Sequence, residues 1–269
     1  MSASGSSDGR TTPPDVAASE GRLRSPQSAA DPSRPVTRSV GAEGAAPQAA
    51  PTRFPAWQRS TPGESPWSAV MAALLAVALQ VVLPTRFVPG HRLVPVLELA
   101  LIVGLGMAQP HRTGHRRRWS RPAGITLVGV ITATNAWSAA RLVHEIIAGT
   151  QDDPVVLLYS GGAIWATNVI VFALWYWECD SGGPATRASG QAHYPDFSFP
   201  QMQNPELAHP DWEPRFPDYL YISFTNASAF SPTDTLPLAR WAKMAMLTQS
   251  AISLVTIALV ISRAVGLFK

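Results

Sequence analysis

The chain has 269 residues, of which 46% are hydrophobic and only 14% are charged, and its formal net charge is +3. The single cysteine, Cys179, excludes an intrachain disulfide framework. The arginines of the N-terminal part are interspersed with acids, which argues against the clustered basic surface of a nucleic-acid-binding protein.

Residues 1–60 are rich in Ala, Ser, Pro, Gly and Arg, and they contain almost no large apolar side chain before Phe54. Such a segment cannot bury enough apolar surface to offset the loss of chain entropy on folding, so we predict a disordered tail. It has no continuous apolar stretch of the kind found in a secretory signal peptide.

Five apolar runs follow the tail, and a helix needs about 20 residues to cross a bilayer. Backbone polar groups in lipid must be satisfied within their own segment, so each run is predicted to be a helix. The second run is short, and the short link before it favours a hairpin with the first. The predicted fold class is an all-α integral membrane protein with about five transmembrane helices, at residues 66–84, 93–108, 124–147, 155–177 and 238–268.

A polar segment, residues 180–236, separates the fourth run from the fifth. Between Asp180 and Arg240 there are seven acids and three arginines, which gives a formal charge of −4. A surface of this charge attracts cations. An ordinary solvated loop explains the same composition.

The link between the second and third runs is strongly basic, and the positive-inside rule places such a link in the cytoplasm. The N-terminus is then cytoplasmic, in a multi-pass protein of the cell membrane. With five spans the acidic segment is cytoplasmic too, which is opposite to the filter loop of a conventional channel. The basic residues of the link are Arg112, Arg116, Arg117, Arg118 and Arg121.

Residues 218–268 contain, in order, an aromatic and apolar stretch, a small polar turn and a long apolar run. We expect the first stretch to form a short amphipathic or re-entrant helix, with Leu220 and Phe224 on the stripe that packs on the bundle. The sequence SFTNASAFSPTD, at residues 223–234, resembles the potassium-channel sequence SFTTLTTVGYGD. This resemblance covers about fifty residues and implies the pore helix, filter and inner helix of a tetrameric cation channel. The residues identical in type are Ser223, Phe224, Thr225 and Asp234.

The filter positions depart from this pattern, because Ser231 and Thr233 replace the two glycines and Pro232 replaces the tyrosine. A potassium filter needs backbone carbonyls turned inward, which glycine allows and proline restricts, so potassium selectivity is not expected. One interpretation is a wider constriction. The other is an ordinary helix start with Ser231 as N-cap and Pro232 in the first turn. The residues predicted to line a constriction are Thr225, Asn226, Ser228 and Asp234.

The chain from about Trp67 onward also resembles bacterial multi-pass membrane proteins of unknown function, through a YxSFTxAxAFSPTD-like segment before the last helix. This resemblance implies about five spans with a large loop before the last, and it implies no activity.

Ionisable and amide side chains inside the runs are the remaining candidates for function, because such groups are costly in lipid. Glu98 can bond to a polar group on a neighbouring helix or act functionally. Arg141 and Glu145 are spaced to pair along one helix face. Two asparagines can bond between helices. The intramembrane polar candidates are Glu98, Asn135, Arg141, Glu145 and Asn168.

We find no motif for catalysis, a cofactor or a metal, so we do not expect an enzyme. The first hypothesis is a channel-like homo-oligomer that passes cations. The second is a non-conducting scaffold or accessory subunit that binds partners through its acidic loop. The third is a small-solute transporter that uses Glu98 and Glu145. The lipid bilayer is the expected partner in all three, and nucleic acid in none.

Overall fold

The structure is a computed structural model, and it describes residues 54–90, 93–107, 120–150, 153–191, 194–229 and 234–267. The tail up to residue 53 and four of the link arginines, Arg112 and Arg116–Arg118, lie outside these ranges. So do Ser231, Pro232 and Thr233, the residues on which the filter and helix-start interpretations rest.

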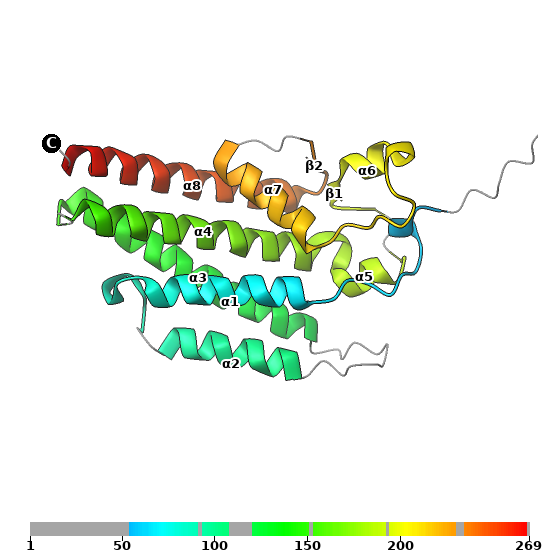
Figure 1. The fold of residues 1–269 in the computed structure, drawn as a ribbon, viewed down its shortest axis with the longest axis horizontal. Coiled ribbons are helices and arrows are strands. Elements are labelled where there is room, and N and C mark those ends of the chain that lie inside the picture. Colours follow the sequence, from blue (N-terminus) through cyan, green and yellow to red (C-terminus); the bar gives the residue numbers. More distant parts are fainter. Residues whose placement is uncertain are drawn as a thin grey trace, which may run out of the picture. The chain divides into compact units, whose positions relative to one another are not determined.

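The described chain is mostly helical, and its long helices alternate in direction to form a bundle (Figure 1). Each of the five predicted apolar runs forms one helix. The central one is α4, which packs against α1, α3, α7 and α8. The long helices are α1 (Trp67–Val82), α2 (Leu93–Met107), α3 (Ser120–Ala148), α4 (Pro154–Cys179) and α8 (Arg240–Leu267).

Proline and short polar residues set the ends of these helices. At α4, Asp153 accepts hydrogen bonds from the backbone N–H groups of Val155 and Val156, and Pro154 stands in the first turn. At α1, the helix stops at Val82 because Pro84 biases Leu83 to an extended conformation. The observed helices therefore extend or shorten the predicted runs by only a few residues.

Within the described residues, three helices are long and apolar enough to cross a membrane, namely 121–148, 154–182 and 240–267. Their 28 to 29 residues correspond to about 42 Å at 1.5 Å per residue, against a hydrocarbon core of about 30 Å. α1 and α2 have 16 and 15 residues, which correspond to about 24 Å and 22 Å. These two helices are shorter than the expected spans, because prolines and glycines close the hairpin early.

Along the bundle axis, the turn of the α1–α2 hairpin does not reach as far as the ends of the longer helices. It contains the 3₁₀ helix η2 (Thr85–Phe87). The Ser138 hydroxyl donates to the Phe87 carbonyl at 2.8 Å, and Tyr159 donates to the carbonyl of Val82. Ser138 is ten residues before the end of α3. The hairpin therefore turns back before it reaches the end of the bundle.

Small elements cover the opposite end of the bundle, and we call residues 54–66, 180–191, 194–215 and 234–239 the cap (Figure 1). The segment that the sequence predicted as an acidic loop is folded here rather than irregular throughout. A two-stranded antiparallel pair joins its ends, with Phe197 opposite Pro237 and Ser198 opposite Leu236. The cap elements are η1 (Ala56–Gln58), η3 (Asp180–Gly182), α5 (Pro184–Ala188), β1 (Phe197–Ser198), α6 (Pro200–Gln203), η4 (Pro205–Leu207) and β2 (Leu236–Pro237).

Aromatic side chains join the cap to the bundle. The Phe197 ring lies 5.2 Å from that of Tyr176 on α4 and 5.8 Å from that of Trp241 on α8. Phe197 and Tyr176 are fully buried. Edge-to-face and tilted pairs of this kind add to the gain from burial, so β1 anchors the cap on the ends of two long helices.

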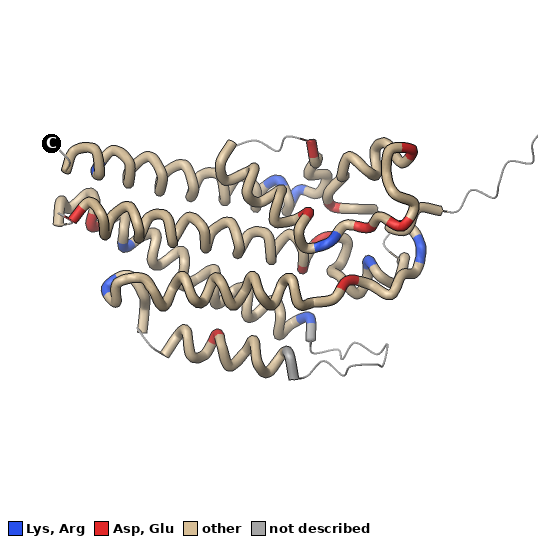
Figure 2. The backbone as a smooth tube through the Cα atoms, viewed as in Figure 1, with Lys and Arg blue, Asp and Glu red and all other residues tan. Residues whose placement is uncertain are grey.

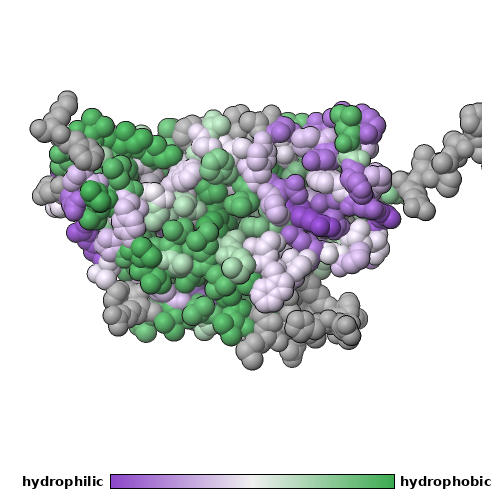
Figure 3. Space-filling model, viewed as in Figure 1, coloured by the Kyte–Doolittle hydropathy of each residue, from purple (hydrophilic) through white to green (hydrophobic). Residues whose placement is uncertain are grey.

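The surface properties of the bundle differ from those of the cap. Charged residues gather at the ends of the bundle and in the cap, whereas the helices between carry few (Figure 2). The side of the bundle is hydrophobic and the cap is hydrophilic (Figure 3). Exposed apolar residues occur along it, including Met71, Val96 and Leu254 at 60%, 62% and 52% exposure. An apolar surface of this extent is typical of a protein surrounded by lipid.

α4 and α8 pack closely against each other at Gly161. A Cβ atom placed there would lie 2.7 Å from Cγ2 of Val260 on α8, whereas one at Gly162 would meet nothing within 4 Å. The two helices are thus in close contact at Gly161 and not at Gly162. A small residue at a helix contact lets the two backbones pack closely.

Gly161→Ala is therefore expected to destabilise the protein by about 1–3 kcal/mol, because Val260 has one favoured rotamer in a helix and cannot easily move aside. Gly162→Ala is the matched control, expected to be neutral or slightly stabilising. Thermal unfolding of both variants in one detergent makes the comparison. The double variant Gly161→Ala with Val260→Ala should recover stability; equal effects of the two single variants would contradict the close contact.

Candidate functional site

The short helix α7 (Phe216–Ala229) follows the cap, and acids fix its first turn. Asp218 accepts a hydrogen bond at 2.8 Å from the backbone N–H of Arg215, just before the helix. Glu64 accepts from the backbone N–H of Phe216 at 2.9 Å and from the Trp177 indole at 2.8 Å. Two carboxylates thus satisfy N–H groups that a helix start leaves without partners. Burial raises the pKa of the Asp218 carboxyl, and the hydrogen bond from Arg215 opposes this shift.

From this start α7 runs into the bundle beside α4 and α8 (Figure 1). The Tyr219 hydroxyl donates to Asp180 at 2.5 Å, and the Ser223 hydroxyl donates to the Val169 carbonyl of α4 at 2.6 Å. One turn further, the Asn226 amide donates to the Met246 carbonyl of α8 at 2.9 Å. Met246 is six residues into α8, so the end of α7 lies about 9 Å or more below the start of α8.

The chain then returns to the end from which α7 came. Residues 236–237 form β2 and pair with β1 in the cap, and the Leu238 N–H donates to the Asp196 carbonyl at 2.8 Å. α8 starts immediately afterwards and runs the full length of the bundle (Figure 1). α7 is therefore re-entrant with respect to the bundle: it enters from the cap end and leaves toward the same end.

A polar core holds α7 in this position, and Gln249 of α8 is its centre. The Gln249 Oε1 accepts from the Tyr176 hydroxyl at 2.7 Å and from the Asn226 amide at 2.9 Å. Its Nε2 donates to the Ser223 carbonyl at 2.9 Å and to the Ser223 hydroxyl at 2.6 Å. All four residues are at most 2% exposed. The amide thus uses both its atoms to join α4, α7 and α8.

A second asparagine extends this network along α4 and α8. The Asn168 amide donates to the Ser253 hydroxyl at 3.1 Å and to the Gln249 carbonyl at 3.4 Å. The bonding between helices that was predicted for Asn168 is thus present. We use the name polar core for Asn168, Tyr176, Ser223, Asn226, Gln249 and Ser253.

The four predicted constriction residues do not share one environment in a single chain. Asn226 is 2% exposed and belongs to the polar core. Thr225 and Ser228 donate to carbonyls of their own helix, at 2.9 Å and 2.7 Å. Asp234 is exposed beyond the end of α7. Asn226 therefore positions α7, whereas Ser228 and Asp234 lie on the surface.

The buried face of α7 differs from the predicted stripe. Phe224 is 50% exposed and its ring lies 5.8 Å from that of Trp165. Leu220 is partly buried against the core. The fully buried positions include the polar residues Ser223 and Asn226. A hydrophobic pattern could not indicate this face, because its polar groups are buried only by virtue of partners on other helices.

Glu98 is fully buried on α2 and accepts a hydrogen bond from the Thr134 hydroxyl of α3 at 3.1 Å. The predicted bond to a polar residue on a neighbouring helix is therefore present. Asn135 is 4% exposed, but its Oδ1 atom has no hydrogen-bond partner among the described residues.

The predicted pair at the end of α3 is present as well. Arg141 Nη2 lies 3.8 Å from Glu145 Oε1, and Arg86 of η2 brings its Nε to 3.3 Å from Glu145 Oε2. His144, in the same turn, is exposed. The sequence did not indicate Arg86, which the hairpin turn brings to this carboxylate. The ion pair between Arg86 and Glu145 thus fastens the hairpin turn to α3.

Many acids of the predicted acidic loop are used inside the cap. Asp180, fully buried, accepts from the Asp196 N–H at 3.0 Å, and Asp196 accepts from the Ser181 N–H at 2.8 Å. Glu213 accepts from the Thr61 hydroxyl at 2.7 Å. The cap therefore presents less free negative charge than its composition suggests. Within the described ranges, no group of three or more His, Cys, Asp or Glu residues is placed to hold a metal ion.

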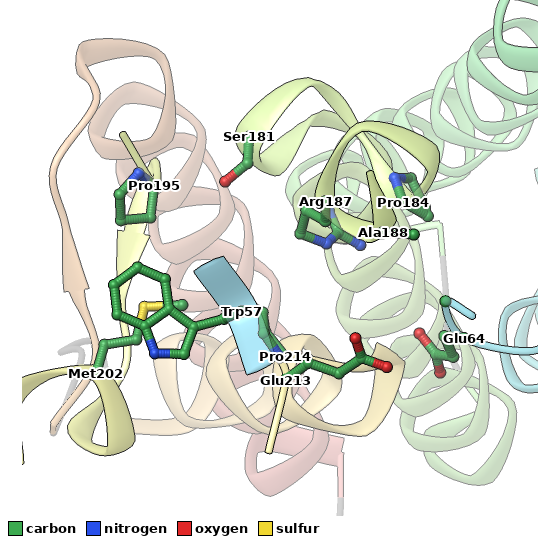
Figure 4. Close-up of a pocket in the computed structure, with 11 residues that line it drawn as sticks. Trp57, Glu64, Ser181, Pro184, Arg187, Ala188, Pro195, Met202, Glu213 and Pro214 are labelled. Atoms are coloured by element: carbon green, nitrogen blue, oxygen red, sulfur yellow. The ribbon is translucent and has the colours of Figure 1, made fainter. Parts of the chain in front are cut away.

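Two hollows lie in the cap. The smaller, of about 30 Å³, is lined by residues of three segments, among them Trp57, Arg187 and Glu213 (Figure 4), and it has room for a water molecule or two. The larger, of about 310 Å³, is lined by Trp57, Trp212 and His209 among others. Neither hollow is lined by a residue that the sequence predicted to line a constriction or to be a polar group inside the membrane.

Comparisons with known protein families, with characterised proteins and with solved structures gave no match. The geometry of α4, α7 and α8 is therefore the basis of any functional assignment.

Replacing Gln249 by Met is expected to lower the free energy of unfolding by roughly 2 kcal/mol or more, because Tyr176, Asn226 and Ser223 lose buried partners. The neighbouring Thr248→Val is the matched control. Its hydroxyl bonds only to the Met244 carbonyl of its own helix, so a change within about 0.5 kcal/mol is expected. Chemical denaturation in mild detergent measures both. Similar values for the two variants would show that the polar core does not hold α7.

Proposed function

We propose that this protein is a homo-oligomeric, channel-like membrane protein that passes cations without potassium selectivity. The observation that carries this proposal is the re-entrant helix α7 between two long helices. The chain contains, in order, the long helix α4, a large part of the cap, the short re-entrant helix α7, a return to the cap end and the long helix α8. This is the order of parts in the pore module that the sequence of residues 218–268 resembles.

The electrostatics of α7 favour a cation near its inner end. The last carbonyls of a helix carry a partial negative charge equivalent to about half an elementary charge. Because α7 ends inside the bundle, this charge is directed toward the middle of the membrane. Potassium channels use carbonyl oxygens to replace the hydration shell of the ion. Here Ser231, Pro232 and Thr233 oppose such a ladder, so we assign the narrow region to Thr225, Ser228 and Asp234.

The face of α7 that the bundle leaves uncovered supports the proposed homo-oligomer. Tyr221 and Phe224 are 52% and 50% exposed, and Ser228 is exposed beside them. Hydroxyl groups at membrane depth are found where helices meet more often than where they face lipid. A second copy of the chain would cover this face, and a ring of copies would enclose the ends of α7.

We further propose five spans, with α1 and α2 crossing as a short hairpin in a locally thinned bilayer. The cap and the basic link then lie in the cytoplasm, following the positive-inside rule. This orientation is independent of how deeply the hairpin inserts. α1 and α2 run in opposite directions (Figure 1), so the hairpin begins and ends on the same side. The narrow region would accordingly open toward the cytoplasm.

A non-conducting scaffold is the second candidate, and the larger hollow in the cap favours it. This hollow of about 310 Å³ is lined by the indoles of Trp57 and Trp212 and by an ion pair between Arg59 and Asp211. Aromatic and arginine side chains dominate binding sites between proteins. On this alternative the cap binds a partner and the membrane helices serve as its anchor.

The proposed orientation predicts which end of the bundle a membrane-impermeant thiol reagent can reach in intact cells. In a Cys179→Ser background, Thr150→Cys at the end opposite the cap should be labelled from outside. Leu207→Cys, which is 84% exposed in the cap, should be labelled only after the membrane is permeabilised. Both sites are exposed in the folded protein. The reverse pattern would refute the cytoplasmic assignment of the cap.

Purified protein in liposomes is expected to conduct monovalent cations, and Ser228→Trp should reduce this flux by about tenfold by filling the narrow region. The control is Val96→Trp on α2, which is 62% exposed on a helix that packs against α1 and α3. It should leave the flux unchanged. Absence of flux from the unmodified protein would refute conduction.

Cross-linking tests the oligomer separately from the flux. In the Cys179→Ser background, Ser228→Cys should form disulfide-linked dimers in membranes, whereas the buried Ser223→Cys should not. Cross-linking without any flux would favour the scaffold over the channel.

A further inference from the structure

Outside the polar core that holds α7, the bundle contains a second buried polar group, the carboxyl group of Glu98 on α2. Glu98 is 0% exposed, and it lies beside Thr134, which is 3% exposed. Thr134 is fourteen residues from either end of α3, or about 21 Å along the helix. The carboxyl group is therefore at the middle of the longest helix, at the depth where a charge is most costly.

The hydrogen bonds of this carboxyl group are incomplete. Its Oε1 accepts from the Thr134 hydroxyl at 3.1 Å, but its Oε2 is buried without a hydrogen-bond partner in the part of the chain that the structure describes. Gln80 of α1, 1% exposed, is near enough to interact with the carboxyl. Among the described residues, however, neither amide atom of Gln80 has a partner at hydrogen-bond geometry. An ionised carboxylate buried with one donor would be poorly compensated.

No charge compensates Glu98 from the helices that pack on it. α1 contains no ionisable side chain, and Glu98 is the only one on α2. On α3 the ionisable residues are Arg121 near its start and Arg141, His144 and Glu145 near its end. The nearest along the helix, Arg141, is seven residues or about 10 Å from Thr134. Arg86 of the hairpin turn is directed to Glu145 instead.

We propose that Glu98 is an intramembrane proton-binding site formed by α1, α2 and α3, with Gln80 and Thr134 as its hydrogen-bonding neighbours. The bound proton makes the carboxyl group neutral and turns one of its oxygens into a donor. The Gln80 Oε1, which has no hydrogen-bond partner within the described ranges, supplies an acceptor on the neighbouring helix. Loss of the proton would leave a buried charge near the turn of the hairpin, where it packs on α3, so the packing of the hairpin on α3 is coupled to this site. The inference does not depend on the proposed channel.

Infrared spectroscopy of the full-length protein in lipid nanodiscs at neutral pH tests the site directly. The unmodified protein should show a carbonyl stretching band of a protonated carboxylic acid that Glu98→Gln removes. The matched control Glu145→Gln, at an ion-paired carboxylate, should leave this band in place. Thr134→Val should shift the band to higher frequency, because the oxygen loses its hydrogen bond.

The Thr134→Val spectrum provides a test even if Glu98→Gln does not fold. A spectrum in which neither variant changes any protonated-acid band would show that Glu98 is ionised and would overturn the proposal. Disappearance of the band on addition of sodium or lithium at constant pH would overturn it as well. In that case the oxygens would bind a metal cation in exchange for the proton.

Discussion

The placement of α7 depends on one side chain, the amide of Gln249. Its four hydrogen bonds reach Tyr176 on α4 and Ser223 and Asn226 on α7. A helix of 14 residues has little stability of its own, because most helical stability in proteins comes from tertiary packing. In lipid the hydrophobic effect does not drive helices together, so directional hydrogen bonds and close packing must do so. The polar core is thus what makes a short polar helix stable at this depth.

The cap completes this arrangement from the other end of α7. Glu64 precedes α1 and yet satisfies the first N–H of α7 and the indole of Trp177 on α4. Asp180, directly after α4, holds Tyr219 on α7. The acids that give the segment its negative charge are therefore partly structural. Their carboxylates fix the angle at which the chain enters the bundle, and they contribute less to the field outside it.

The sequence was sufficient to predict the five long helices, because their apolar runs are bounded by prolines and charged residues. It also predicted a short amphipathic or re-entrant helix before the last apolar run and the pair between Arg141 and Glu145. It was not sufficient for the buried face of α7. Ser223 and Asn226 are buried only because Gln249, more than twenty residues further along the chain, meets them. Glu64 was missed for the same reason: its partners at residues 177 and 216 are distant in sequence, and no local pattern marks it.

The polar core and the buried group of Glu98 and Gln80 differ in how completely their hydrogen bonds are made. In the polar core each buried group shared between α4, α7 and α8 has a partner, and such a network specifies one arrangement of helices. At Glu98 and Gln80 the groups are as deeply buried, but hydrogen-bonding capacity is left unused. A satisfied network resists change, whereas an incomplete one can accept a proton at little structural cost. On the proposed proton site, the helices α1 to α3 would respond to protonation, whereas α4, α7 and α8 are held together by the polar core.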